Sequence, residues 1–181
     1  MERRRPESQK GVADTDVDYP LKGSCACGSV QYQMETGPLF THCCHCTWCQ
    51  RETGSAFVLN AMIEAARVTL LKGKPECTLT PSESGKGQKI WRCRSCQVAV
   101  WSNYSGAGDR IHFVRVGTLD DPTALPPDIH IFTATRQPWV VIPEGHLAVE
   151  EYYDRETCWP AESLERRRRL LAKQRREPDS A

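Results

Sequence analysis

Short apolar segments bounded by Gly, Pro and other polar turn residues recur along most of the chain. Alternation of apolar and polar positions, as in Val30–Met34, has the period of two that is typical of strands. Strands are predicted over residues 30–34, 39–42, 56–62, 65–71, 98–101, 111–116 and 129–132, and residues 138–143 are predicted to pack along an edge. Residues 46–53 predict one helical turn that ends at Gly54. This pattern predicts a mainly β domain.

The two ends of the chain differ in character from this β-rich part. Residues 1–18 are polar, with mixed acidic and basic side chains, and we expect them to be disordered. Residues 161–176 are rich in Glu, Arg, Leu and Lys and predict a helix with few apolar positions. The sequence therefore predicts one domain over residues 19–160 and a basic helical or disordered tail over residues 161–181.

Charge and cysteine content narrow the class of protein. The net charge is +1, but residues 1–10 carry +2 and residues 161–181 carry +3, which leaves an acidic body. An acidic body argues against a nucleic-acid-binding core, although Arg166–Arg169 leave a weak alternative of nucleic-acid binding or localisation. No apolar run approaches the ~20 residues of a membrane span, and no secretory signal is evident. We therefore expect a reducing, cytoplasmic setting, where clustered cysteines indicate metal binding or catalysis.

Seven of the ten cysteines fall into motifs with metal-ligand spacing. A CxC pair and a CxxC pair supply four thiolates, which is the number in a closed tetrahedral zinc site. A CxCxxC run supplies three, and three protein ligands with an open fourth position are typical of catalytic zinc. The predicted structural set is Cys25, Cys27, Cys93 and Cys96, and the predicted catalytic set is Cys44, Cys46 and Cys49.

Two alternatives to this partition remain open from spacing alone. In one, the second set is also closed, with His42, His45 or Cys43 as its fourth ligand. In the other, the CxC and CxCxxC motifs form one cluster and the CxxC motif is a redox pair. The remaining thiols, Cys43, Cys77 and Cys158, have no partner by spacing, and we interpret them as ordinary thiols.

The order of these motifs resembles that of a known family. The chain has GSCxCGSV, CHCxxC and CxxC, followed by the run HIFTxxRQPWV that begins at His130. Over residues 20–145 this resembles the glutathione-dependent formaldehyde-activating enzymes, a family that includes centromere protein V. The resemblance implies an Mss4-like, β-rich zinc fold and two zinc ions, one held by the structural set and one by the catalytic set. It also implies condensation of glutathione with formaldehyde, a carbon–sulfur lyase activity.

Several other residues are candidates for the active site. Three thiolates over-neutralise Zn²⁺, so basic groups should steady a fourth, substrate-derived sulfur. Candidates for this role are Arg51, His45 and Arg136, against alternative roles as a surface charge, a loop spacer and a solvated rim residue. Candidates for substrate contact are Trp48, His130 and Trp139, against alternative roles as packing residues. Trp48, Gln50 and Gln97 depart from the residues usual in the family, and Gln97 should strain the second zinc knuckle.

These residues predict a zinc-dependent carbon–sulfur lyase that acts on thiol adducts of an aldehyde or a related reactive metabolite. Glutathione is the expected co-substrate, and Trp48 favours a specialised relative such as a tailoring enzyme. The alternative is a non-catalytic zinc module that binds protein or nucleic acid through its basic termini. The sequence gives no indication of the oligomeric state.

Overall fold

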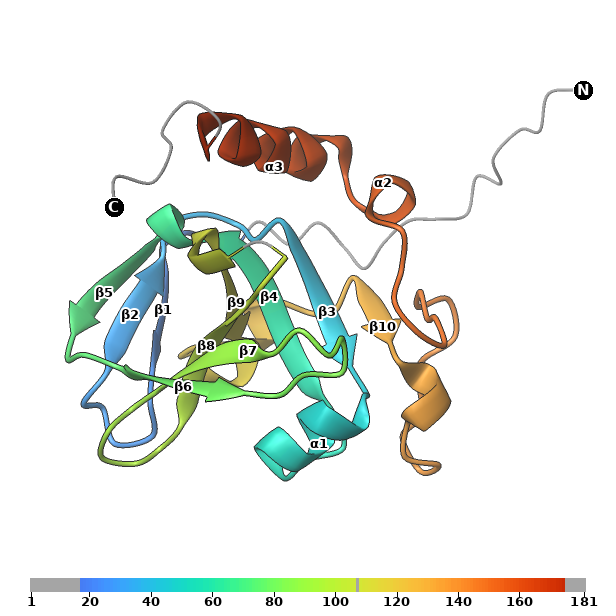
Figure 1. Ribbon diagram of the computed structural model, residues 1–181, viewed down its shortest axis with the longest axis horizontal. Coiled ribbons are helices and arrows are strands. Elements are labelled where there is room, and N and C mark those ends of the chain that lie inside the picture. The colour runs from blue at the N-terminus through green and yellow to red at the C-terminus, as the bar shows by residue number, and fades with distance from the viewer. Residues whose placement is uncertain (1–16, 107, 175–181) are drawn as a thin grey trace, which may run out of the picture.

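The computed structural model describes residues 17–106 and 108–174, and its strands form two sheets (Figure 1). The smaller sheet has the order β1-β2-β5. Its strands are antiparallel and span Leu21–Ser24 (β1), Gln31–Met34 (β2) and Val68–Lys72 (β5).

The larger sheet has seven strands in the order β10-β3-β4-β9-β8-β7-β6. All neighbouring strands are antiparallel except β10 and β3, which are parallel. The strands span Phe40–Cys44 (β3), Val58–Glu64 (β4), Glu76–Thr80 (β6), Gln88–Arg92 (β7), Ala99–Tyr104 (β8), Ile111–Arg115 (β9) and Ile129–Ile131 (β10). The segment that carries the dense cysteine motif is therefore an inner strand, β3, between β10 and β4.

Alternation along the strands divides the buried side chains into two clusters. Ala61 and Val114 belong to a cluster that also includes Tyr32 and Met34 of the smaller sheet. The residues next to them, Met62 of β4 and Phe113 of β9, belong to a second cluster on the opposite face of the larger sheet. That cluster also contains Phe40, Tyr153 and Trp159. Because successive strand residues point to opposite faces, β4 and β9 contribute side chains to both cores, and β3 contributes Phe40 and Cys44 to the second.

Three helices and five single 3₁₀ turns complete the described chain. Helix α1 spans Thr47–Thr53, α2 spans Arg155–Cys158, and α3 spans Ala161–Gln174. The 3₁₀ turns are Ala65–Arg67, Gly108–Arg110, Val116–Thr118, Pro122–Ala124 and Thr133–Thr135. In Figure 1, α1 follows β3 at one end of the larger sheet, and α3 lies at the other end of the molecule.

Helix α3 is attached to the body by both apolar and ionic contacts. Leu164 and Leu170 pack against the second core cluster. The Arg166 guanidinium donates to both carboxylate oxygens of Glu64, at 3.0 and 2.6 Å, and to the carbonyl oxygen of Gly37 at 3.0 Å. Arg166, the first residue of the four-arginine run, thus has a structural role: it holds α3 against the body of the domain.

The structure confirms the predicted β-rich fold and C-terminal helix, and it corrects several details. The strand expected over residues 65–71 begins with a 3₁₀ turn. Strand β6 is not among the predicted strands, because this edge strand is exposed on both faces and so has no buried apolar side. Residues 138–143 form no strand, and Trp139 is 72 % exposed. The expected core packing of Trp139 is therefore wrong. Residues 1–16 and 175–181, on which part of the terminal predictions rests, lie outside the described chain.

Candidate active site and metal centres

The central site is built where β3 ends and α1 begins. Cys44 is the last residue of β3, and Cys46 is the N-cap of α1, where its Sγ accepts a hydrogen bond from the Cys49 N–H at 3.4 Å. Gly54 ends the helix in the left-handed region, with φ 64°, and donates its N–H to the Gln50 carbonyl. The strand and the capped helix together fix the backbone that carries all three thiols.

The thiols of Cys44, Cys46 and Cys49 lie within 4.8 Å of one another, and each residue is at most 5 % exposed. Hydrogen bonds from the Cys44 and Cys49 thiols lower the pKa of the Cys46 thiol to about 3. The hydrogen bond to Cys46 in turn raises the pKa of the Cys44 thiol. Of the three buried thiols, that of Cys46 is therefore the one whose surroundings favour the thiolate.

A row of buried polar side chains lies beside this cluster, across three strands. His42 of β3, Asn60 of β4 and Arg115 of β9 occupy paired positions in the sheet. Arg115 donates from Nη1 to Asn60 Oδ1, its charge lowers the pKa of His42, and it partly offsets the raised pKa of the Cys49 thiol. For His42, burial is the larger cause, and its pKa falls to about 4. Arg115 is thus a cation positioned against the thiol cluster.

Sequence reasoning missed Asn60 and Arg115, although a signal was present. Both residues stand between apolar neighbours in the sequence, Asn60 between Leu59 and Ala61 and Arg115 between Val114 and Val116. They are 1 % and 5 % exposed. A charged residue is rarely buried without a partner, so a polar residue inside an apolar strand indicates a site.

His45 and Cys43 do not join the three-thiol cluster. In the extended segment from β3 to Cys46, alternate residues point to opposite sides. The ligand atoms of Cys43 and His45 gather instead with that of His130, whose Nδ1 lies 3.0 Å from His45 Nε2. Burial lowers the pKa of His45 to about 4, and it also lowers that of His130. Within residues 17–106 and 108–174, no fourth such ligand atom lies with the three thiols.

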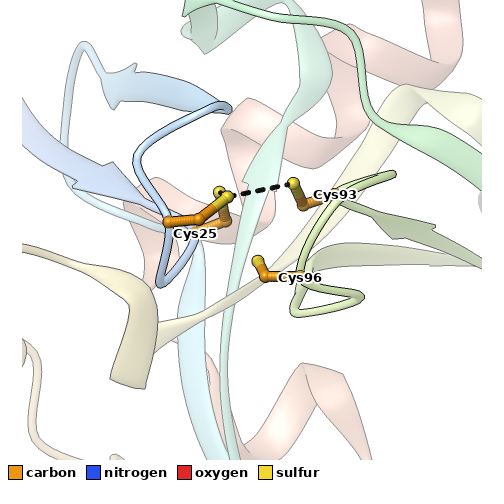
Figure 2. A group of neighbouring side chains, drawn as sticks. Cys25, Cys93 and Cys96 are labelled. Atoms are coloured by element: carbon orange, nitrogen blue, oxygen red, sulfur yellow. Dashed lines mark hydrogen bonds between the residues drawn. The ribbon is translucent and has the colours of Figure 1, made fainter.

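The second cysteine cluster joins an early turn to a turn in the middle of the chain (Figure 2). Cys25 and Cys27 come from the β1–β2 turn, and Cys93 and Cys96 come from the β7–β8 turn. The Cys27 Sγ lies 3.6 Å from that of Cys25 and 3.7 Å from that of Cys93. These are not disulfide distances, and this grouping separates Cys25 and Cys27 from the three-thiol cluster.

Both clusters fit zinc on the chemistry and placement of their donors. Four thiolates around Zn²⁺ at about 2.3 Å in a tetrahedron would lie about 3.8 Å apart, close to the distances in the four-cysteine cluster. Hydrogen bonding with the Ser29 hydroxyl lowers the pKa of Cys27 to about 6, which favours the thiolate that zinc requires. The three-thiol cluster offers the donor set of a zinc site with one open position.

The second knuckle carries the strain expected at Gln97. This residue has φ 61°, in the left-handed region that favours glycine. Its carbonyl accepts from Arg92 Nη1 at 3.0 Å, and its side-chain Nε2 donates to the Arg94 carbonyl at 2.9 Å. These bonds hold the turn that presents Cys93 and Cys96.

The structure places the predicted contact residues at different depths. Trp48 is partly buried and packs against the core cluster that contains the three thiols. Arg136 is partly buried and donates to the Val140 carbonyl, and its charge acts on His45 and His130. Arg51, in the last turn of α1, and Trp139 are exposed. Arg136 and His130 thus lie with His45, whereas Arg51 and Trp139 face solvent.

Gln50 connects the thiol cluster to the segment after β10. Its Nε2 donates to the carbonyl oxygens of His45 and Thr135, at 2.7 and 2.9 Å. Its Oε1 accepts from Gln137 Nε2 at 2.7 Å. Gln50 therefore joins two segments about 85 residues apart in sequence.

A cavity of about 590 Å³ lies next to the four-cysteine cluster, where Cys96 lines it, and none of the three thiols of the other cluster lines it. Its walls come from the end of α1, the start of β4, the end of β9 and the second knuckle. Phe57, which also contacts the His45 ring, lies on one side, and Cys96 and Gln97 lie on another. This volume is within the range of small-molecule sites.

No helix among the described residues is both long and apolar enough to cross a membrane.

Comparison with known proteins agrees with the motif order. Residues 20–135 match the family described as glutathione-dependent formaldehyde-activating enzyme. A solved structure of a Rhodobacter sphaeroides protein is 24 % identical and covers 55 % of this chain and 88 % of its own, with a TM-score of 0.43. No curated protein matches the chain. Since the family match spans more than half of the sequence, this chain belongs to the glutathione-dependent formaldehyde-activating enzyme family.

Proposed function

We propose that this protein is a zinc-dependent carbon–sulfur lyase that makes or breaks the adduct between a thiol, such as glutathione, and a small aldehyde. One observation carries the proposal. Three buried thiols, those of Cys44, Cys46 and Cys49, converge without a fourth protein ligand among the residues described. This donor set leaves one coordination position for a substrate sulfur.

The reaction requires one new bond and one proton transfer. In the forward direction the sulfur of the substrate thiol attacks the carbonyl carbon, and the thiol proton ends on the carbonyl oxygen. When bound, zinc would supply a Lewis acid and template that lowers the pKa of a coordinated thiol. The thiolate is the reactive form of the substrate, so a lower thiol pKa favours the reaction at neutral pH.

The protein's own residues hold the charge of this site. Cys44, Cys46 and Cys49 with Zn²⁺ carry one net negative charge, and a substrate thiolate adds a second. Arg115 lies beside the cluster, and its Nε and Nη2 have no hydrogen-bond partner within the described chain. A buried guanidinium without a carboxylate partner favours an anionic neighbour. Arg115 therefore stabilises the charge that sulfur binding builds up.

Two features of the surroundings bear on which substrate the site would accept. The cavity of about 590 Å³ between α1 and the second knuckle is lined in part by Arg115, and Trp48 packs against the core cluster that contains the thiols. Trp48 is a bulky side chain near the thiols, so we expect selectivity for particular aldehydes and a specialised role such as a tailoring enzyme. Of the residues proposed from sequence, His45 and Arg136 lie behind the thiols with His130, while Arg51 and Trp139 would act only at the rim.

The test is exchange of the adduct measured by NMR. Zinc-loaded protein is incubated with glutathione and a panel of small aldehydes, and exchange between free and adduct signals is followed. We expect faster exchange with at least one aldehyde, loss of that acceleration in Cys46→Ser, and no change in Cys77→Ser. Cys77 is a suitable control because it lies exposed on the edge strand β6. Absence of acceleration with every thiol and aldehyde tried would contradict the proposal.

The alternative of a zinc module that binds partners through basic termini receives no specific support from the described residues. Arg166 is engaged with Glu64 and Gly37. The exposed remainder of the run includes Arg168 and Arg169, which pair with Glu165. A protein with Arg168→Glu and Arg169→Glu that keeps its adduct exchange would separate any tail function from the lyase.

A further inference from the structure

A third group of metal-ligating side chains lies behind the three-thiol cluster. Its members are Cys43, His45 and His130, and their ligand atoms lie within 4.8 Å of one another. Cys43 and His130 are paired in register between the parallel strands β3 and β10. His45 follows β3 directly, and its backbone N–H donates to the Ile131 carbonyl at 3.0 Å. The backbone pairing therefore brings together residues that are about 85 positions apart in sequence.

These three side chains are buried, and the two histidine rings have few hydrogen-bond partners. Cys43, His45 and His130 are 3 %, 0 % and 8 % exposed. The two imidazoles share one contact, between His45 Nε2 and His130 Nδ1 at 3.0 Å. Their other nitrogens, His45 Nδ1 and His130 Nε2, have no hydrogen-bond partner within the part of the chain described. These outer nitrogens are not the ones that face each other, so the atoms placed to bind an ion are the two facing nitrogens and the Cys43 thiol.

We propose that Cys43, His45 and His130 form a third metal site, which takes a divalent transition-metal ion of the zinc class. One thiolate and two imidazoles suit borderline-soft cations and do not suit Mg²⁺ or Ca²⁺. About 2.0–2.1 Å from a tetrahedral zinc ion, two imidazole nitrogens lie about 3.3 Å apart, so the facing nitrogens need to separate by only a few tenths of an ångström. The ion then replaces the proton between the two rings, and the Cys43 thiol releases its own proton on binding.

The fourth position of this site is left to water or a small anion. His146 is the nearest further imidazole, with its ring centroid 5.8 Å from that of His130, but it does not belong to the group of three. Arg136 lies close enough to act electrostatically on both histidines. A nearby guanidinium disfavours a cation, and only one thiolate is present. We therefore expect this site to bind zinc more weakly than either of the thiolate-rich clusters.

Two ions would then sit on opposite sides of one strand. Cys44 and Cys46 serve the proposed lyase site, while Cys43 and His45, which alternate with them, serve the third site. The third ion would link β3 to β10 and hold the backbone from the side away from the substrate. This role is separate from the proposed lyase chemistry and does not depend on it.

The test counts zinc in the full-length protein. Protein is dialysed to equilibrium against buffered zinc at several free concentrations, and bound zinc is measured by elemental analysis. We expect three equivalents in the wild type, with the third lost first as free zinc falls. Cys43→Ser and His130→Gln should each hold two, Cys77→Ser should hold three, and Cys43→Ser combined with Cys46→Ser should hold one. The combined variant separates loss at the third site from loss at the lyase site.

A spectroscopic readout identifies the ligands independently of the count. With Co²⁺ as the probe, the third equivalent bound by wild-type protein should add the charge-transfer absorption of a single thiolate. That increment should be absent in Cys43→Ser, whose far-UV circular dichroism should match the wild type. Two equivalents of metal in the wild type, or an unchanged third equivalent in Cys43→Ser, would overturn the proposal. Neither result would bear on adduct exchange at Cys44, Cys46 and Cys49.

Discussion

The guanidinium of Arg166 and the carboxylate of Glu64 form a two-pronged ion pair, with Nε–Oε1 and Nη2–Oε2 distances of 3.0 and 2.6 Å. The pair joins helix α3 to the end of strand β4, 102 residues earlier in the chain. Both side chains are largely buried, at 16 % and 8 % exposure. The pair is therefore shielded from the solvent that weakens surface ion pairs.

Removal of Arg166 should destabilise the protein. We expect Arg166→Ala to lower the free energy of unfolding by about 3 kcal/mol, because Glu64 would be left as a buried charge without its closest partner. Arg168→Ala is the matched control, since its side chain is 67 % exposed and its contacts among the described residues, with Glu165 and the Leu164 carbonyl, lie on the same helix. That control should change stability by less than about 0.5 kcal/mol. Urea unfolding followed by circular dichroism measures both values, and equal effects would contradict a docked helix.

The two cysteine clusters should respond differently to mutation. Cys93→Ser should unfold much of the protein, since its cluster joins two distant turns and structural zinc contributes folding free energy directly. Cys46→Ser should lose about one equivalent of zinc while the fold survives. Thermal unfolding with zinc analysis distinguishes the two, and a folded Cys93→Ser protein with unchanged melting temperature would refute the structural assignment.

Arg115 should contribute to catalysis without binding metal. Arg115→Leu should lower the rate of adduct exchange about 10- to 100-fold, because the negative charge of the thiolates loses its nearest buried cation. Zinc content should stay near the wild-type value. Arg51→Ala, at the exposed end of α1, should change the rate less than about threefold. If Arg51→Ala has the larger effect, Arg51 steadies the substrate sulfur as its sequence position predicts, and the role proposed for Arg115 fails.

Relief of backbone strain at Gln97 should stabilise the second knuckle. Glycine adopts φ 61° without a Cβ clash, so Gln97→Gly should raise the free energy of unfolding by about 0.5–1 kcal/mol, less whatever its side-chain bond to Arg94 contributes. Gln97→Ala removes that same bond but keeps the Cβ, and it should be less stable than both other proteins. A chemical denaturation series of the three proteins ranks them.

Local patterns are sufficient to predict the β-rich fold, helix α1 and both groups of cysteines. The CxC, CxxC and CxCxxC spacings encode ligand sets directly, since neighbours two or three positions apart can converge on one ion. The contact between His45 and His130 escapes prediction, because it depends on the parallel pairing of β10 with β3. For the same reason, spacing alone presents Cys43 as an ordinary thiol. The link between Asn60 and Arg115 likewise arises from strand register, which no local pattern specifies.

The alternation of donors from Cys43 to Cys46 also fixes the length of this segment. Inserting or deleting one residue before Cys44 would exchange the two sides of the strand, so that each donor would face the wrong cluster. A single substitution removes one ligand, whereas a shift of one position misdirects all of them. Single-residue insertions at Phe40–Cys44 should therefore be tolerated far less well than substitutions there, as a library scored for folded, zinc-containing protein would reveal.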